Sequence, residues 1–160
     1  MRPTAILSLL LFGAAASLAA ATKTTHTTTA THAKAAAPAV AHGLTAADLK
    51  WVTRPEMAGA MMAVAYGNPE TGPFGAFEKW PAGAKQPLHH HTANVRGVGL
   101  SGTLVITMED GKVLELGPGS FASIPSKAKH TTECKPGAEC SFFVEMTGKA
   151  DTVPAEVAKK

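Results

Sequence analysis

The chain has 160 residues, 45% of them hydrophobic and 17% charged, which suits one domain with its own core and excludes two domains of ordinary size. Its formal net charge of +3 would ordinarily suggest nucleic acid or an anionic membrane as a partner. Acidic and basic residues nearly balance between 44 and 148, however, and the positive excess lies in the two ends, so no nucleic-acid partner is expected.

The first 21 residues have the layout of a secretory signal peptide. Arg2 supplies a short positive region, an apolar run covers 5–18, and the small residues of 19–21 suit cleavage before Thr22. An uncleaved membrane anchor is the alternative, but the apolar run is shorter than the ~20 residues needed to span a bilayer. We therefore expect a bacterial protein that is periplasmic or secreted, with no stable membrane insertion after cleavage.

Residues 22–43 form a tract of threonine, alanine, lysine and histidine without hydrophobic periodicity. Such a composition buries too little apolar surface to offset the entropy of ordering it, which predicts a disordered linker. The tract contains His26, His32 and His42, which allows the alternative of a metal-scavenging tail. A spacer is favoured, because the histidines are isolated and ligand sets need convergent geometry.

Short segments suited to β-strands alternate with glycine- and proline-rich turns from residue 44 to 148. These segments are 61–66, 74–80, 96–100, 103–108, 112–116, 121–124 and 142–146. Such spacing predicts an antiparallel sandwich or barrel, so the expected fold class is all-β. Asp110-Gly111 is the clearest hairpin signal, because this dipeptide accepts the positive φ angles of a tight turn. The one helix candidate is 45–50, with Thr45 as its N-cap.

Apolar side chains of these segments are expected to line two facing sheets. The expected core residues are Met57, Met61, Met62, Val64, Phe74, Phe77, Trp80, Leu104, Ile106, Phe121, Ile124, Phe142 and Val144. The methionines are interpreted as core filler, because a copper site would need them clustered and accessible. Residues 149–160 carry several lysines and no clear pattern, which predicts a flexible C-terminal tail.

Histidines occur in two segments that could supply a metal site. On an extended chain alternate side chains share a face, so His89 and His91 would point into one cavity and His90 away from it. Two imidazoles so placed form half of a metal site. A second segment, which contains Gly119 and Pro125, ends in His130, a weak signal by itself.

Together these two segments resemble the two conserved segments of the cupin superfamily. The positions on the expected spacing are Gly83, His89, His91 and Gly102 in the first segment, and Gly119, Pro125 and His130 in the second. The resemblance covers about 57–148 and in finer detail is similar to small single-domain bacterial cupins, some related to the metal-binding domain of the ChrR anti-sigma factor. It implies a cupin β-barrel, a double-stranded β-helix or jelly roll, over residues 44–148.

The resemblance implies that His89, His91 and His130 bind a divalent metal ion, and Fe, Zn, Mn, Ni and Cu are not distinguished. Val95 stands where the family has a glutamate ligand, and Lys127 where it has a glycine. A three-histidine site leaves positions open for water and substrate. Because its ligands are neutral, the metal charge favours anionic or enolate-type ligands.

Several polar residues are candidates to complete this site. Glu78, Glu133 and Glu145 are candidate replacements for the missing carboxylate, and Asn94 is a further polar candidate beside the site. Arg96 could orient a substrate carboxylate by a bidentate contact, or face outward as a surface charge. The sequence leaves these alternatives open, because it does not show which side chains face inward.

Cys134 and Cys140 flank a turn of five residues between two strand-like segments. In an exported protein such a pair favours a structural disulfide. Two soft metal ligands and a redox-active pair are the alternatives, and both are weakened by the lack of a Cys-x-x-Cys motif.

Three functions are compatible with these patterns, because one fold hosts many chemistries. The first is an exported cupin that binds a divalent metal through three histidines and a small molecule, expected to be anionic, in its barrel. The second is a metal-dependent dioxygenase that uses the same histidines for iron, as in cupins similar to cysteine dioxygenase or diketone-cleaving dioxygenase. The third is a metal-free structural or partner-binding barrel. The oligomeric state is open, and the resemblance is compatible with a homodimer.

Overall fold

The computed structural model describes residues 41–156, so the expected signal peptide and most of the expected linker lie outside the described residues. Within this range the regular secondary structure consists of β-strands alone, as the short segments between turns predict. In chain order the strands are β1 (Val52–Thr53), β2 (Met61–Gly67), β3 (Phe74–Trp80), β4 (Lys85–His90), β5 (Val95–Ser101), β6 (Leu104–Met108), β7 (Val113–Leu116), β8 (Phe121–Ile124), β9 (His130–Cys134), β10 (Cys140–Met146) and β11 (Val153–Pro154).

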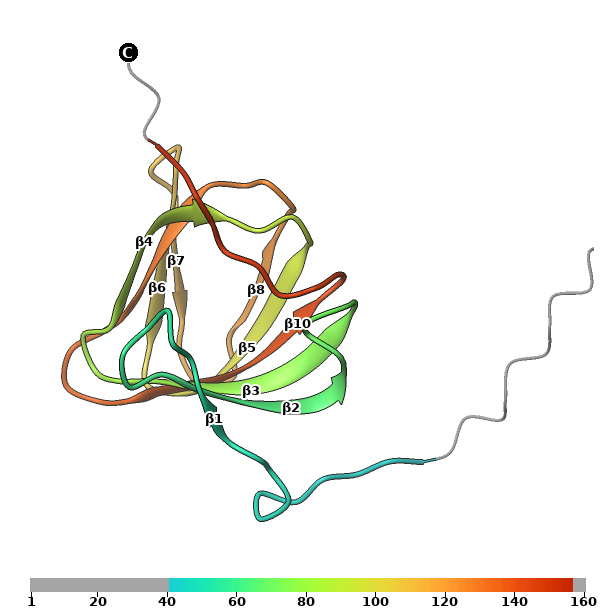
Figure 1. Ribbon diagram of the computed structural model, residues 1–160. Helices are drawn as coiled ribbons and strands as arrows, with labels where there is room; N and C mark the ends of the chain where they lie inside the picture. Colours follow the sequence, from blue (N-terminus) through green and yellow to red (C-terminus); the bar gives the residue numbers. More distant parts are fainter. Residues whose placement is uncertain (1–40, 157–160) are drawn as a thin grey trace, which may run out of the picture. The chain divides into compact units, whose positions relative to one another are not determined.

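The strands form two sheets that face each other and enclose the core (Figure 1). One sheet has the order β1-β2-β3-β10-β5-β8, and the other has the order β11-β4-β9-β6-β7. Strands distant in sequence are neighbours, since β10 lies between β3 and β5, and β9 lies between β4 and β6. This antiparallel, interleaved arrangement is that of a jelly-roll barrel and confirms the expected fold class.

The predicted strand segments agree with seven of these strands, whereas β4 and β9, which carry the histidines, were not predicted as strands. Neither has the apolar alternation of a typical strand: β4 reads KQPLHH and β9 reads HTTEC. The predicted hairpin at Asp110-Gly111 is confirmed. It joins β6 to β7, and Gly111 has a φ of 88° there.

The helix expected over 45–50 is not formed. The amide of Asp48 donates a 3.0 Å hydrogen bond to the carbonyl oxygen of Thr45, which closes a single turn. The Asp48 carboxylate accepts hydrogen bonds from the amide and the hydroxyl of Thr45. These contacts are typical of a helix N-terminus, but no helix follows them. The segment is too short to recover the free energy of helix nucleation before β1 begins. None of the described residues lies in a helix that is long and apolar enough to cross a membrane.

The core lies between the sheets and is built from alternate residues of each strand. In β10 every second side chain is buried. Phe121, expected in the core, is 64% exposed, because Ala122 and Ile124 take the inward positions of β8. Phe77, also expected there, is only partly buried and packs edge-on against Phe143, with ring centroids 5.2 Å apart.

The chain after β10 remains attached to the barrel, which corrects the expected flexible tail over residues 149–156. Val153 and Pro154 of β11 pair with His90 and His89 of β4, and the amide of Ala155 donates to β4 at 3.0 Å. Figure 1 shows this segment in red, running across the barrel toward β4. The fold therefore extends past residue 148, because the unpaired edge of β4 accepts another strand.

The predicted disulfide between Cys134 and Cys140 is present. It closes the turn between β9 and β10, with Cα atoms 5.8 Å apart, and both residues are buried. The bond thus links the two sheets at one end of the barrel.

Candidate metal centre

Three histidine side chains converge inside the barrel. His89 lies in β4, His91 directly follows that strand, and His130 begins β9, where it pairs with His89. One ring nitrogen from each histidine lies within 4.8 Å of those of the other two. His90 is not in this cluster, as the alternation of side chains along an extended chain predicts.

The main chain holds each of these rings in one orientation. Nδ1 of His89 and Nδ1 of His130 each donate to the carbonyl oxygen two residues earlier, at 2.7 Å and 2.9 Å. Nδ1 of His91 donates to the carbonyl oxygen of Asp151 at 2.5 Å. Because a carbonyl oxygen only accepts, each neutral ring carries its proton on Nδ1 and keeps the Nε2 lone pair free.

Burial keeps the cluster uncharged at neutral pH. It lowers the pKa of His89 to about 4 and brings the pKa values of His91 and His130 below the ordinary histidine value. Nε2 of His89 is buried without a hydrogen-bond partner, although a buried polar atom normally has one. Neutral imidazole nitrogens suit several divalent transition metals, and such an ion would satisfy this atom. The residues present therefore fit a metal ion.

No carboxylate joins the three histidines within the described part of the chain. Val95, at the position of the family glutamate, lines the same cavity with an apolar side chain. Of the candidate acids, only Glu78 lines the cavity. Glu133 and Glu145 pair instead with surface cations, at 3.1 Å and 3.0 Å. Any metal ion here would have three protein ligands and open positions.

Two further candidates also lie outside the cavity. Arg96 forms the ion pair with Glu145 and faces solvent, so it is an outward-facing surface charge and does not line the cavity. The side-chain oxygen of Asn94 accepts a 2.9 Å bond from the amide of Ser126 and is exposed. Neither side chain reaches the histidines, because in β5 and the turn before it these residues occupy outward positions.

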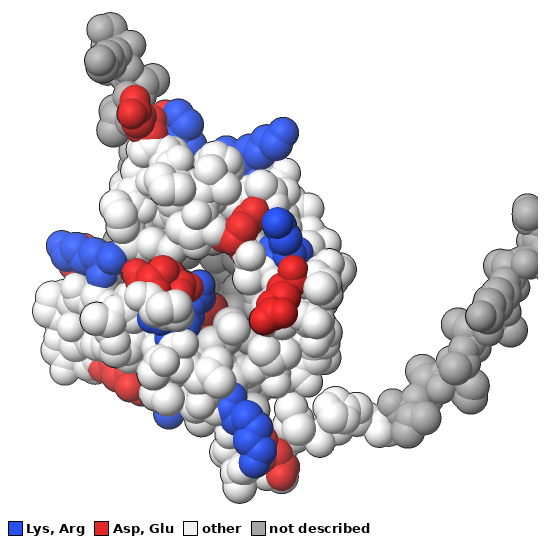
Figure 2. Space-filling model, viewed as in Figure 1, with Lys and Arg blue, Asp and Glu red and all other residues white. Residues whose placement is uncertain are grey.

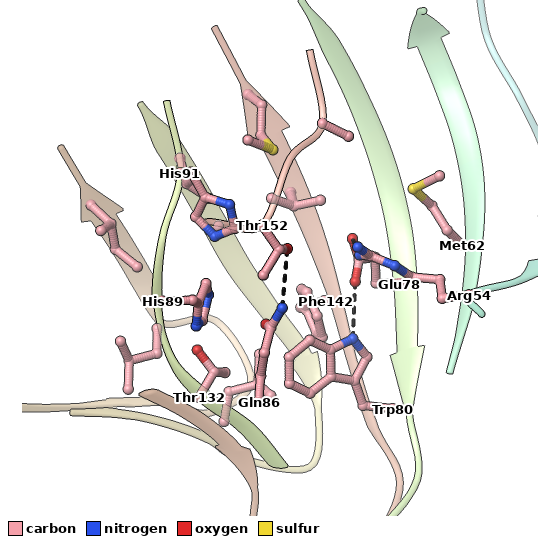
Figure 3. Close-up of a pocket in the computed structure, with 18 of the residues that line it drawn as sticks. Arg54, Met62, Glu78, Trp80, Gln86, His89, His91, Thr132, Phe142 and Thr152 are labelled. Carbon is pink, nitrogen blue, oxygen red and sulfur yellow. Dashed lines mark hydrogen bonds and ion pairs between the residues drawn. The ribbon is translucent and has the colours of Figure 1, made fainter. Parts of the chain in front are cut away.

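The histidines border a cavity of about 220 Å³ inside the barrel, and most of the cavity wall is apolar. The apolar wall residues come from both sheets and include Phe74, Leu104, Ile106, Leu116, Ile124, Phe142, Val144 and Met146. Figure 3 shows two polar groups facing the same space. In one, Gln86 donates to the hydroxyl of Thr152 at 3.2 Å, and in the other, Glu78 lies between Arg54 and Trp80.

The cavity opens beside two chain segments that are distant in sequence. Residues 53–56, at the end of β1 and directly after it, and residues 150–152, which follow β10, contribute to its wall. Figure 2 shows a hollow in this face with acidic and basic side chains beside it. The charged lining residues near the opening include Arg54, Glu56 and Asp151.

Comparison with known proteins supports the cupin assignment. Residues 23–153 match a family described as a domain of unknown function, DUF4437. The chain belongs to this family, and its barrel has the cupin fold. No curated protein matches the sequence.

Solved structures similar to this cupin share its fold at low sequence identity. The polyketide cyclase RemF from Streptomyces resistomycificus is 20% identical, with a TM-score of 0.58 over 76% of this chain and 87% of that one. An RmlC-like cupin from Shewanella frigidimarina NCIMB 400 is 14% identical, with a TM-score of 0.56 over 69% and 93%. A chain of the Rhodobacter sphaeroides SigE complex with anti-sigma ChrR is 19% identical, with a TM-score of 0.51 over 64% and 50%.

The cupin barrel also brings residues to the site that the sequence did not single out. Asp151 acts through its main-chain carbonyl, a group that every residue has, so no sequence pattern could indicate it. Arg54 and Trp80 reach the cavity by contacts with Glu78. A weak signal existed for Trp80, because it shares with Glu78 and Phe74 the alternating positions of one strand.

Proposed function

We propose that this cupin binds a divalent transition-metal ion through His89, His91 and His130 and presents it to a small organic molecule in the barrel. The observation that carries this proposal is the buried, unpartnered Nε2 of His89. It lies beside two other imidazoles whose Nδ1 atoms already donate to main-chain carbonyl oxygens. A purely structural barrel gains nothing from three converging rings that keep Nε2 as an acceptor, since an unsatisfied buried polar atom such as Nε2 of His89 is destabilising.

The chain's own residues would hold and shield the metal ion. The three imidazoles need not lose a proton before they bind a metal ion, because burial already keeps them neutral. The apolar wall limits water in the cavity, which strengthens electrostatic interactions there. A bound divalent ion would supply Lewis-acid chemistry at its open positions.

The ligand of the open positions is proposed to be a mainly apolar molecule with an anionic or enolate-type oxygen. Neutral imidazoles leave the full charge of the metal uncompensated, which favours a negatively charged oxygen. The apolar wall suits the remainder of such a molecule. One structural relative, RemF, is a polyketide cyclase, which is compatible with an organic ligand in a barrel of this fold.

Metal content tests the proposal. The purified protein, equilibrated with Zn²⁺ and freed of excess, is expected to hold about one equivalent by elemental analysis. His89→Ala and His130→Ala are expected to lose it. His90→Ala is the matched control, because its ring lies between two proposed ligands in sequence but outside the cluster. Less than about a tenth of an equivalent in the parent protein would instead favour the metal-free barrel.

A second candidate function, metal-dependent catalysis of the dioxygenase type, is favoured by one observation. Glu78 places a carboxylate in the same cavity as the histidines, where it could serve as an acid or base. Oxygen consumption by the iron-loaded protein with diketones, thiols and flavonoids tests this function, with the metal-free protein as its control. No consumption with any of these compounds would count against it.

We also propose that the protein is exported. The disulfide between Cys134 and Cys140 supports an oxidising compartment, and the family match begins at residue 23, one residue after the expected cleavage product starts at Thr22. N-terminal sequencing of protein from the periplasm or medium is expected to begin at about Thr22. A cytoplasmic protein that retains Met1 would contradict export.

A further inference from the structure

Glu78 occupies an inward position of β3 that alternates with apolar residues. Phe74, Ala76 and Trp80 share this face of the strand, and all are buried together with Glu78, which is 5% exposed. Replacing a buried ion pair by well-packed apolar residues is often neutral or stabilising. Stability by itself therefore does not require a charged side chain at this place, and Glu78 lines the cavity that the histidines border.

Each carboxylate oxygen of Glu78 has one protein partner. Nη1 of Arg54 donates to Oε1 at 2.6 Å, and Nε1 of Trp80 donates to Oε2 at 2.9 Å. A carboxylate oxygen has two lone-pair positions, so each oxygen keeps capacity for another donor. Figure 3 shows the carboxylate between its two partners, across the cavity from His89 and His91. We call Glu78, Arg54 and Trp80 the Glu78 site.

The charge of Arg54 is already compensated. Nε of Arg54 donates to the Glu56 carboxylate at 2.6 Å, while Nη1 holds Glu78. One guanidinium thus faces two carboxylates, so a third carboxylate brought in by a ligand would meet net negative charge. A hydroxyl group, which donates a hydrogen bond without adding charge, suits the free capacity of Glu78.

We propose that the Glu78 site binds a hydroxyl group of an uncharged or metal-bound organic ligand and rejects a carboxylate at that end. This assignment rests on the proposed function. The ligand would face the histidines with one oxygen and Glu78 with another. The ring pair of Trp80 and Phe142, with centroids 5.6 Å apart, forms the adjoining wall and suits a flat apolar body.

Three probes of similar size test the Glu78 site: phenol, toluene and benzoate. Each is titrated into ¹⁵N-labelled protein that a chelator has freed of metal, so that no carboxylate can bind through a metal ion. The indole N–H resonance of Trp80, assigned with Trp80→Phe, reports binding. Phenol is expected to bind at least about fivefold more tightly than toluene, because a hydrogen bond to a charged acceptor strengthens binding. Benzoate is expected to bind most weakly.

Glu78→Gln tests whether Glu78 causes the expected order of probe affinities. Glu145→Gln is the matched control, since Glu145 is exposed and outside the cavity. Removing the Glu78 charge is expected to abolish the advantage of phenol over benzoate, whereas the control keeps it. Benzoate or toluene binding to the metal-free parent protein as tightly as phenol would overturn the proposal without any variant. If the probe order holds while metal titration fails, the Glu78 site stands and the metal function falls.

Discussion

The main-chain carbonyl oxygen of Asp151 accepts a 2.5 Å hydrogen bond from Nδ1 of His91, 60 residues earlier in the chain. The Asp151 carboxylate is held in turn by Thr92, whose amide and hydroxyl donate at 3.0 Å and 2.5 Å. The segment after β10 therefore orients one of the three proposed ligands. Partners of this kind fix the tautomer and direction of a metal-binding histidine.

Removing residues 149–160 is expected to weaken metal binding by about 10- to 100-fold, because His91 loses the acceptor that orients it. Competition with a chelating dye measures the affinity. Removing only 157–160 is the control, and Thr92→Val, which deletes one bond to Asp151, is expected to act in the same direction with a smaller effect. Unchanged affinity in the folded truncated protein would contradict a positioning role for this segment.

Lys127 is expected to be a site where glycine stabilises the fold. It is the single non-glycine residue with a positive φ among those described, at 64°, and it stands where the cupin pattern has a glycine. Lys127→Gly is expected to raise the free energy of unfolding by about 0.5–1 kcal/mol, the relief of left-handed strain less the added entropy of the unfolded chain. Urea unfolding measures this.

Lys127→Ala separates strain from the loss of the lysine side chain, because alanine keeps the Cβ atom that disfavours a positive φ. It is expected to give no stabilisation. The amide of Lys127 donates to the carbonyl oxygen of His91 at 2.7 Å in any case, so neither variant should change metal binding. Equal stabilisation by both variants would show that strain at this position is not the cause.

The metal-free protein is expected to lose stability as the pH falls from 6.5 toward 4. Burial lowers the pKa of His89 from 6.5 to about 4, so the unfolded chain binds this proton more tightly than the folded one. The contribution is complete above pH 6.5 and declines through this window, by about 1.4 kcal/mol for each unit of pKa difference.

Urea unfolding of the metal-free protein across this pH range measures the effect. His89→Gln is expected to show a shallower decline than the parent protein, because it has no titrating ring at this position. His42→Gln, at an exposed position outside the barrel, is the control and should follow the parent. Parallel pH profiles for all three proteins would exclude His89 as a source of the dependence.

Replacing both cysteines by alanine is expected to lower the free energy of unfolding by about 2–3 kcal/mol, since the bond closes a short loop with a sequence separation of 6. Thermal unfolding of the double variant, compared with the parent in the presence and absence of a reductant, measures the loss. Metal content should stay the same, because neither cysteine lines the cavity. A drop in metal content with unchanged stability would point to a role other than cross-linking.

Local patterns made much of the fold predictable. Strand-length apolar segments, the Asp110-Gly111 turn and the spacing of the two histidine segments are all properties of neighbouring residues, and each is present in the structure as predicted. Phe121 shows the limit of such patterns: its hydrophobicity suggests the core, but the register of β8 against β5 turns it to solvent.

The candidate acids show the same limit at the site. Glu78, Glu133 and Glu145 all lie in strands, and the sequence treats them alike. Sheet register alone decides that Glu78 faces the cavity while the other two face lysine and arginine on the surface. Arg54 enters the cavity only because the turn after β1 folds against β3.

By itself, the sequence determined the all-β class, the cupin resemblance and the identity of the three clustered histidines, because strand alternation and turn chemistry act over a few residues. Tertiary structure decided how those histidines are oriented. It brought the carbonyl of Asp151 to His91, set Glu78 across the cavity, and kept the chain after residue 148 on the edge of β4. These contacts join segments far apart in the chain, and they arise from the packing of two sheets, which no local pattern specifies.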